Sequence, residues 1–351
     1  MSTPQLPAGY SPERIEIRTV ADGLIAEIND LQNEIGTEAR PELPGRPAAE
    51  AINNVRTMLS TWEDWTTLVR DSEGRLVALV AGGVNRTGEN EHAFDLEVEV
   101  LPAHRRRGIG AWGLFEAAQA AAAARASLLI AWSDSTVTPG EAFARWAGFD
   151  SALVERESDL VLANVDWDMV QRWVDEGPGR APGYSLRFVQ GDYPEELYED
   201  VIAWQDVMNT APRDELQVND ERQTVEQLAE REARFASSER DRLEYIARHD
   251  ESGTAIGGTN LDYFPWTPSL MWQGATAVHP DHRGHALGKW LKAAMLQKMR
   301  ELFPDVEIVR TGNAYSNDPM LGINNKLGFK ETRAFMVWQA PVDRILAGGG
   351  S

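Results

Sequence analysis

The chain has 351 residues, about twice the length of a typical domain of ~100–200 residues, and its 42% hydrophobic and 25% charged residues are ordinary for a folded protein. It contains no cysteine, which excludes disulfides, thiolate metal sites, iron–sulfur clusters and cysteine nucleophiles. The net charge is −21, so nucleic acid and membrane lipid are not expected as partners. Such a surface would attract a cationic small molecule, although solubility alone also explains it.

No export or membrane segment is visible in the sequence. The first residues, MSTPQLPAGYSPE, are polar and rich in proline, and they lack the apolar stretch of a signal peptide. The most apolar run, from Ala117 to Trp132, contains Gln119 and Arg125 and is too short to span a bilayer. The sequence therefore predicts a cytoplasmic protein.

The same order of elements occurs twice along the chain. Each copy begins with a short strand, at residues 15–18 and 184–187, and continues through two helical regions. Two strands joined by a hairpin follow in each copy. The turns of these hairpins, residues 71–74 and 250–253, contain the Asp and Gly that tight hairpins favour.

The second part of each copy is also repeated. A strand, at residues 94–101 and 270–279, ends in Val-x-Pro and is followed by a basic turn and a long helix. A further strand and a short helix end in Gly-Phe, at residues 148–149 and 328–329. The chain is therefore a duplicated domain, because units of this length are too long for a solenoid.

A segment rich in glycine and proline separates the two copies. Residues 175–183, Asp-Glu-Gly-Pro-Gly-Arg-Ala-Pro-Gly, have the composition of a linker. We therefore expect one domain at residues 1–180 and a second at residues 181–351.

The turn before each long helix has the composition of an anion-binding site. It reads Val-Leu-Pro-Ala-His-Arg-Arg-Arg-Gly-Ile-Gly at residues 100–110 and Val-His-Pro-Asp-His-Arg-Gly-His-Ala-Leu-Gly at residues 278–288. Small residues let the backbone approach a ligand closely, and the first N–H groups of a helix have no internal partner. These features favour pyrophosphate binding, to which Arg105 and Arg283 would add charge-assisted hydrogen bonds.

Other interpretations of this turn are weaker. Neither copy has the G-x-G-x-x-G spacing of a dinucleotide-binding fingerprint. A P-loop requires Lys and then Ser or Thr after the second glycine, whereas Ala111 and Lys289 follow it here. A helix start with incidental glycines is the alternative for one turn alone, and two copies in the same setting argue against it.

The pattern Arg-x-x-Gly/Ala-x-Gly after a Val-x-Pro strand end resembles the acetyl-CoA motif of the GNAT superfamily of N-acetyltransferases, and the Gly-Phe endings resemble that family's Leu-Gly-Phe segment. The repeat covers nearly the whole chain, so it is similar in layout to a tandem GNAT protein of the mycothiol synthase kind. The resemblance implies an α/β fold of two tandem GNAT domains, each a splayed mixed β-sheet flanked by helices.

The resemblance also implies acetyl-CoA as the cofactor and CoA as the product. The pantetheine arm would enter the sheet at the splay, where a bulge in the fourth strand frees backbone N–H groups that can stabilise an oxyanion. The residues that would contact the cofactor are Val100, Arg105, Arg106, Arg107, Gly108, Ile109 and Gly110 in the first copy, and Val278, Arg283, Gly284, His285, Ala286, Leu287, Gly288, Lys289, Asn313 and Asn317 in the second.

The second domain is favoured as the catalytic one. Its segment Thr311-Gly-Asn-Ala-Tyr-Ser-Asn317 resembles the family's segment in which asparagine amides hold the cofactor arm, whereas residues 133–137 of the first copy contain no asparagine. The first domain would bind CoA or serve as a scaffold. For Asn313 and Asn317, capping of a turn is the alternative role.

The general acid is the least defined part of the site. Many GNAT enzymes carry a tyrosine just before the Leu-Gly-Phe segment, where this chain has Ala144 and Asn324. Tyr315 is the candidate acid nearby, and a structural aromatic residue is the alternative.

A general base is also needed, because an alkyl ammonium is almost wholly protonated at pH 7. Glu97 and Glu99 are candidates that share one face of a predicted strand in the first domain. In the second domain, Asp262 and Glu215 are candidates by elimination. A solvated surface carboxylate is the alternative for all four.

The remaining chemistry-bearing side chains suggest no second cofactor. His279, His282 and His285 have a spacing on the turn that suits anion contacts, and we predict no metal site. Trp266 and Trp272 either pack in the core or line an acceptor pocket.

The sequence thus predicts an acetyl-CoA-dependent N-acetyltransferase that acts on the primary amine of a small molecule, by direct attack in a ternary complex. A catalytically degenerate acyl-CoA-binding sensor or scaffold and a protein N-acetyltransferase are the alternatives. The sequence does not indicate whether the protein is a monomer or a homodimer.

Overall fold

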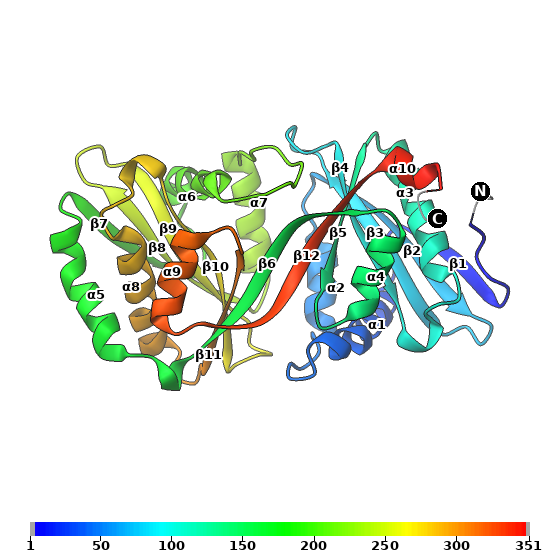
Figure 1. The fold of residues 1–351 in the computed structure, drawn as a ribbon, viewed down its shortest axis with the longest axis horizontal. Coiled ribbons are helices and arrows are strands. Elements are labelled where there is room, and N and C mark those ends of the chain that lie inside the picture. Colours follow the sequence, from blue (N-terminus) through cyan, green and yellow to red (C-terminus); the bar gives the residue numbers. More distant parts are fainter. Residues whose placement is uncertain (1–3, 349–351) are drawn as a thin grey trace. The chain divides into compact units, whose positions relative to one another are not determined.

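The computed structural model describes residues 4–348, which fold into two compact units. Unit 1 comprises the chain up to Val154, the segment Asp214–Asn219 and the chain from Ala334 on. Unit 2 comprises Glu155–Arg213 and Asp220–Arg333. Each unit contains a mixed β-sheet with helices packed against it, so the predicted α/β fold is confirmed (Figure 1).

Unit 1 is built on a sheet with the strand order β1-β2-β3-β4-β5-β12. Strands β4 and β5 pair in parallel, and the other pairs are antiparallel. Its strands are β1 Tyr10–Ile15, β2 Trp62–Asp71, β3 Leu76–Asn85, β4 Ala93–Val100, β5 Leu128–Asp134 and β12 Lys330–Pro341. Its helices are α1 Asp22–Ala39, α2 Ala48–Arg56, α3 Ile109–Ala123, α4 Thr138–Trp146 and α10 Val342–Leu346.

Unit 2 repeats this plan with the order β6-β11-β10-β9-β8-β7, in which β10 and β11 are the parallel pair. Its strands are β6 Asp150–Val161, β7 Tyr184–Gln190, β8 Asp241–His249, β9 Ala255–Tyr263, β10 Leu270–Val278 and β11 Ile308–Ala314. Its helices are α5 Trp167–Arg180, α6 Tyr198–Asp206, α7 Val225–Ala236, α8 Leu287–Leu302 and α9 Asp318–Leu327.

One strand of each sheet comes from the other copy of the repeat: β12 in unit 1 and β6 in unit 2 (Figure 1). Residues Glu155–Val161 of β6 follow the first copy in sequence, yet they pair with β11 in unit 2. Residues Phe335–Pro341 of β12 follow the second copy, yet they pair with β5 in unit 1. The repeat divides the sequence near residue 180, but the compact units exchange these segments.

The prediction of a linker at residues 175–183 is wrong for residues 175–180, which form the last turns of α5. Gly177 is buried, and a Cβ atom there would lie only 2.4 Å from the indole ring of Trp290 on α8. The glycine therefore allows close packing of two helices. Composition alone does not distinguish this use of glycine from a flexible connection.

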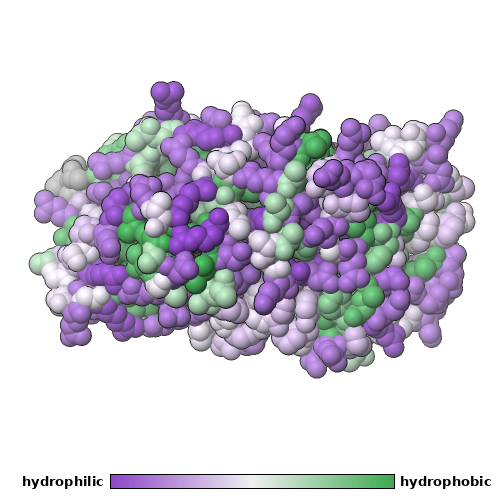
Figure 2. Space-filling view, turned by 180° about the vertical axis from the view of Figure 1, so that it is seen from behind, coloured by the Kyte–Doolittle hydropathy of each residue, from purple (hydrophilic) through white to green (hydrophobic). Residues whose placement is uncertain are grey.

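Hydrophilic residues predominate on the face drawn in Figure 2, and hydrophobic residues form separate patches on it. This distribution agrees with the large net charge of −21. Within residues 4–348, no helix combines the length and the hydrophobicity that spanning a membrane requires.

Candidate acyl-CoA site

Strand β10 of unit 2 is bulged where it leaves its parallel neighbour. It pairs with β11 only from Leu270 to Gln273. Its register with β9 shifts between Gln273 and Thr276, because Gly274 and Ala275 together face one residue of β9. The backbone of these two residues is therefore regularly paired with neither neighbour, and the predicted bulge at the splay is confirmed for unit 2.

Strand β4 of unit 1 has the splay without the bulge. It pairs with β5 only from Ala93 to Asp95. Its register with β3 is continuous from Asp95 to Val100. The predicted bulge is therefore wrong for unit 1, where β4 has one residue fewer than β10 between the start of the parallel pairing and the last valine of the strand.

Both turns use two residues in the left-handed conformation. In unit 2 these are Gly284 with φ of 91° and Ala286 with φ of 58°. In unit 1 the same positions are Arg106 with φ of 61° and Gly108 with φ of 95°. Such a backbone, followed directly by the first turn of a helix, presents N–H groups to an anion. The donor set thus fits a pyrophosphate in both units.

The side chains of Arg105 and Arg283 hold the turns together. In each unit the arginine Nε donates a 3.0 Å hydrogen bond to the carbonyl oxygen of Val100 or Val278. The Arg105 guanidinium also pairs with Glu38, at 2.7 and 3.0 Å, and Arg283 Nη2 donates to Thr210 at 2.9 Å. These bonds connect the turn to the end of the preceding strand.

The second glycine of each motif lies against a neighbouring helix. A Cβ atom at Gly288 would lie 3.1 Å from Cδ1 of Ile323, and one at Gly110 would lie 3.4 Å from the ring of Phe143. A larger side chain at either position would therefore collide with that helix where α8 or α3 begins.

The other residues expected at the cofactor have varied environments. Ile109 and Leu287 are buried core residues at the start of their helices. Arg107 donates to the hydroxyl of Tyr10 and to a turn carbonyl. His285 packs beside the ring of Tyr184, and Lys289 lies 5.6 Å from the ring centroid of Trp173.

The two asparagines expected to hold the cofactor arm make bonds within the protein. The Oδ1 atom of Asn317 accepts a bond from the backbone of Met320 and caps α9, which is the alternative role for this residue. Asn313 Oδ1 accepts a 2.6 Å bond from Asn324 Nδ2. Asn324 itself is 1% exposed, and its own Oδ1 atom has no partner.

Tyr315 is exposed at the end of β11, and its hydroxyl donates to Glu331. Its pKa is raised by partial burial and by this carboxylate. These contacts do not join it to the turn or to the bulge.

A histidine cluster adjoins the turn of unit 2. Tyr184 Oη lies 2.9 Å from His282 Nδ1, and the rings of His249, His279 and His285 surround this pair at centroid distances of 5.3–5.8 Å. Burial and the neighbouring histidines lower the pKa of His282. Among the described residues, no three His, Asp or Glu side chains are grouped so that they could hold a metal ion.

The tyrosine–histidine pair is a feature of both copies that the sequence reasoning missed. In unit 1, Tyr10 Oη lies 3.0 Å from His104 Nδ1, and the rings meet edge to face. The signal was available, since a tyrosine near the start of the first strand and a histidine just before the arginine of the turn occur in both copies.

The two candidate carboxylates of unit 1 lie in a crowded setting on β4. Burial and the charge of Glu97 raise the pKa of Glu99 to about 8, and its Oε2 atom has no hydrogen-bond partner. Burial by the surrounding groups also raises the pKa of Glu97, although part of its side chain still reaches solvent. The nearby polar groups come from α1 and the loop after it, Gln32 and Arg46.

In unit 2, Asp262 is the candidate carboxylate that lies next to β10. It is directly opposite Trp272 in the register of β9 and β10, and it accepts a 3.1 Å bond from Asn260. Burial raises its pKa. Glu215 belongs to unit 1, where its backbone bonds to Ala152, so it is not a candidate in unit 2.

A separate surface hollow in unit 1, with a volume of about 450 Å³, is lined by Glu63, Arg86, Glu91, His92 and residues 123–125. It contains none of the predicted site residues, and ion pairs of Arg86 with Glu63 and Glu91 lie within it. It is therefore not the candidate site.

The sequence matches the acetyltransferase (GNAT) family over residues 27–149 and 203–329, once for each copy of the repeat, so the chain belongs to this family. The fold is similar to a tandem GNAT protein from the clavulanic acid biosynthesis pathway, with a TM-score of 0.75, 24% identity, and coverage of 95% of this chain and 98% of that one.

Two further solved structures share the fold. A GCN5-related N-acetyltransferase from Sphaerobacter thermophilus has a TM-score of 0.64 and 14% identity, with coverage of 96% and 97%. The Saccharomyces cerevisiae N-myristoyltransferase, solved with myristoyl-CoA, has a TM-score of 0.59 and 12% identity, with coverage of 96% and 81%. A comparison with curated proteins finds no match. The protein is thus a tandem GNAT protein with an acyltransferase fold.

Proposed function

We propose that this protein is an acetyl-CoA-dependent N-acetyltransferase for the primary amine of a small molecule, and that unit 2 carries out the transfer. The observation that carries the proposal is the bulge at Gly274 and Ala275. It lies where β10 parts from β11, within five residues of Val278, at which the turn sequence begins. Unit 1 has the turn and the splay but keeps a continuous register on β4.

The residues of unit 2 supply distinct parts of such a site. Acetyl-CoA would bring an acyl group activated as a thioester. The turn from Arg283 to Gly288 would bind its pyrophosphate through backbone N–H groups and the positive end of α8. The backbone N–H groups of Gly274 and Ala275, which lie outside the regular pairing of β10, would serve as fixed donors for the acyl carbonyl oxygen, and fixed donors of this kind lower acyl-transfer barriers.

Asp262 is the proposed base in unit 2. Its raised pKa brings the carboxylate closer to the value at which it can remove a proton near neutral pH. Trp272 lies beside it on the same face and offers an aromatic surface for the acceptor. A cationic amine suits this carboxylate and the net charge of −21.

Unit 1 has a different proposed role. Its turn fits the same pyrophosphate, but its β4 offers no bulge, so we assign it acyl-CoA binding without transfer. If unit 1 does transfer acyl groups, Glu97 and Glu99 are its candidate bases.

The experiment is a thiol-release assay with acetyl-CoA over amines, amino acids and aminoglycosides, combined with calorimetric titration of acetyl-CoA. We expect saturable binding and CoA release with at least one class of amine. Asp262→Asn should lower turnover without lowering acetyl-CoA affinity. Binding without release across the panel would favour the sensor role, and absence of binding would contradict both.

A further inference from the structure

Buried polar side chains next to the bulge of unit 2 form a hydrogen-bonded network. Lys292 of α8 is 2% exposed, and its Nζ donates a 2.9 Å hydrogen bond to Oε1 of Gln273. Gln273 Nε2 in turn donates to Thr259 Oγ1 at 2.9 Å, and Thr259 Oγ1 lies 2.8 Å from Thr276 Oγ1. Gln273 and Thr276 are the two residues that flank the bulge.

The other copy of the repeat supplies an internal comparison. Gly110 and Gly288 are equivalent, and four residues further along the helix stand Leu114 in unit 1 and Lys292 in unit 2. Val98 pairs with Val80 in unit 1, as Thr276 pairs with Thr259 in unit 2, each two residues before the last valine of the strand.

The equivalence of Leu96 and Gln273 follows from the parallel strand pairs. Ala93 pairs with the first residue of β5, and Leu270 pairs with the first residue of β11. Leu96 and Gln273 each lie three residues after these starting points. Unit 2 therefore carries Thr, Gln, Thr and Lys where unit 1 carries Val, Leu, Val and Leu.

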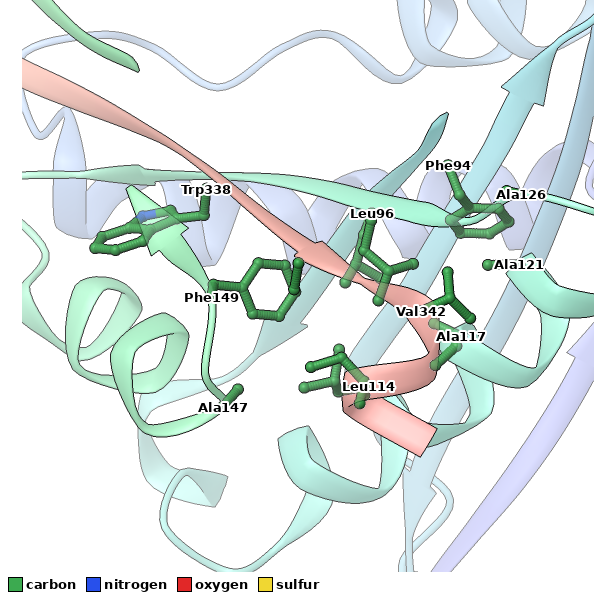
Figure 3. Packing of buried hydrophobic residues seen from close by; sticks show 14 of the residues in the cluster. Phe94, Leu96, Leu114, Ala117, Ala121, Ala126, Ala147, Phe149, Trp338 and Val342 are labelled. Atoms are coloured by element: carbon green, nitrogen blue, oxygen red, sulfur yellow. The ribbon is translucent and has the colours of Figure 1, made fainter. Parts of the chain in front are cut away.

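The unit 1 residues form an ordinary apolar core. Val80, Leu96 and Leu114 are buried in one cluster with Val98 packed against it, and Figure 3 shows Leu96 and Leu114 within this cluster. The fold thus tolerates an apolar set at these four positions. Burying a polar group costs free energy unless hydrogen bonds compensate for the lost water, and burying a charged amine costs most.

The network and the bulge occur together in unit 2 and are both missing from β4 of unit 1. The side chain of Gln273 bonds to Thr259 and to the backbone carbonyl of Asn260, the residue of β9 that faces the bulge. The backbone carbonyl oxygen of Gln273 accepts a 3.2 Å hydrogen bond from Thr311 Oγ1 of β11. Gln273 is thus fixed from α8, β9 and β11 at the point where the sheet opens.

We propose that Lys292 and Gln273 are positioning residues that hold the bulge of β10 open, and so set the backbone donors of Gly274 and Ala275 for the acyl carbonyl of the thioester. This inference rests on the proposed function of unit 2. Burial lowers the pKa of Lys292 to about 7, so about half of the amine is neutral at pH 7, which reduces the cost of its burial.

The test separates binding of the acyl group from binding of the rest of the cofactor. In the full chain carrying Gly110→Arg, which fills the turn of unit 1, CoA and acetyl-CoA are titrated by calorimetry against Lys292→Met and Gln273→Leu. We expect CoA affinity to stay within about twofold, while acetyl-CoA affinity falls by about three- to tenfold, the contribution of one neutral hydrogen bond.

Four further variants distinguish the proposed role from a general effect of altered packing. Leu114→Met, at the equivalent position of unit 1, should leave both affinities unchanged. Thr276→Ser keeps the hydroxyl and should behave as the parent, whereas Thr276→Val should weaken acetyl-CoA alone. The fourfold change to the unit 1 residues, Thr259→Val, Gln273→Leu, Thr276→Val and Lys292→Leu, should fold and lose the preference for acetyl-CoA.

The outcomes are distinguishable. The starting protein is the full chain carrying Gly110→Arg. If it binds both ligands, and the variants keep its ratio of acetyl-CoA to CoA affinity, the inference is overturned while the proposed function stands. An equal loss of both affinities would also overturn it, because that result indicates a purely structural role. If the parent binds neither ligand, the proposed function and the inference fall together.

Discussion

The hydroxyl of Tyr184 lies 2.9 Å from Nδ1 of His282, and Tyr10 and His104 form the same pair at 3.0 Å in the other unit. Each tyrosine begins the first strand of its sheet, and each histidine immediately precedes the arginine of the turn. The pair therefore ties the edge of the sheet to the turn that we expect to bind pyrophosphate.

Loss of this hydroxyl should destabilise each unit to a similar extent. Tyr184→Phe and Tyr10→Phe each remove one partly buried hydrogen bond to histidine, which contributes about 1 kcal/mol. Tyr10→Phe also removes the bond that Arg107 donates, which is exposed to solvent and contributes little. We expect a decrease in Tm of about 2–4 °C for each variant. Thermal unfolding followed by circular dichroism would measure it, and unchanged curves for both variants would show that the pair is not stabilising.

The contact between α5 and α8 can be tested with two glycines of one helix. Gly177→Ala would place a methyl group 2.4 Å from the ring of Trp290, so we expect a loss of about 1–3 kcal/mol from overpacking. Gly179→Ala meets no atom within 4 Å and should be neutral or stabilising by about 0.5–1 kcal/mol. Denaturant unfolding of the two variants distinguishes them, and equal effects would contradict the packing described here.

The left-handed residue at the start of α8 should be improved by glycine. Ala286→Gly relieves a left-handed φ of 58°, and the gain exceeds the added chain entropy by about 1 kcal/mol at most. Ala122→Gly, on the exposed face of α3, should instead destabilise by about 1 kcal/mol. The prediction fails if both substitutions lower Tm.

Glu99 should make stability depend on pH. Its pKa is raised from 4.5 to about 8, so the folded unit 1 binds this proton more tightly than the unfolded chain does. Its contribution is therefore fully present below pH 4.5 and is lost as pH rises through about 8. Glu99→Gln should be more stable than the parent at pH 8.5, and the difference should shrink toward pH 5.

A matched substitution at an exposed turn residue, Glu73→Gln, should show no such pH-dependent difference. Tm measured from pH 5 to pH 8.5 for the three proteins tests this prediction. A Glu99→Gln variant that is less stable than the parent at the alkaline end would contradict it.

Much of the fold follows from repeated local patterns. The hairpins, the Val-x-Pro strand ends and the glycine-containing turns specify the order of elements within each copy, because each depends on a few neighbouring residues. The exchange of β6 and β12 was not predicted. Both segments can pair with either β5 or β11 as far as local sequence indicates, and only tertiary packing selects the partner.

The site was predicted less completely than the fold. The bulge at Gly274 and the turn before Gly288 follow from the motif, but Asn317 is engaged in capping α9. Lys292 was missed because a lysine on a helix normally indicates a solvated face, and its burial is evident only from its packing against the preceding strand, where it bonds to Gln273.

The central claim is that unit 2 transfers the acyl group, and a matched pair of glycine variants tests it most directly. Gly288→Arg and Gly110→Arg each fill one turn, and the thiol-release rate is measured for both with the amine that the wild-type protein accepts. We predict that Gly288→Arg abolishes release and that Gly110→Arg retains most of it. Retention by Gly288→Arg together with loss in Gly110→Arg would contradict the account and assign the transfer to unit 1.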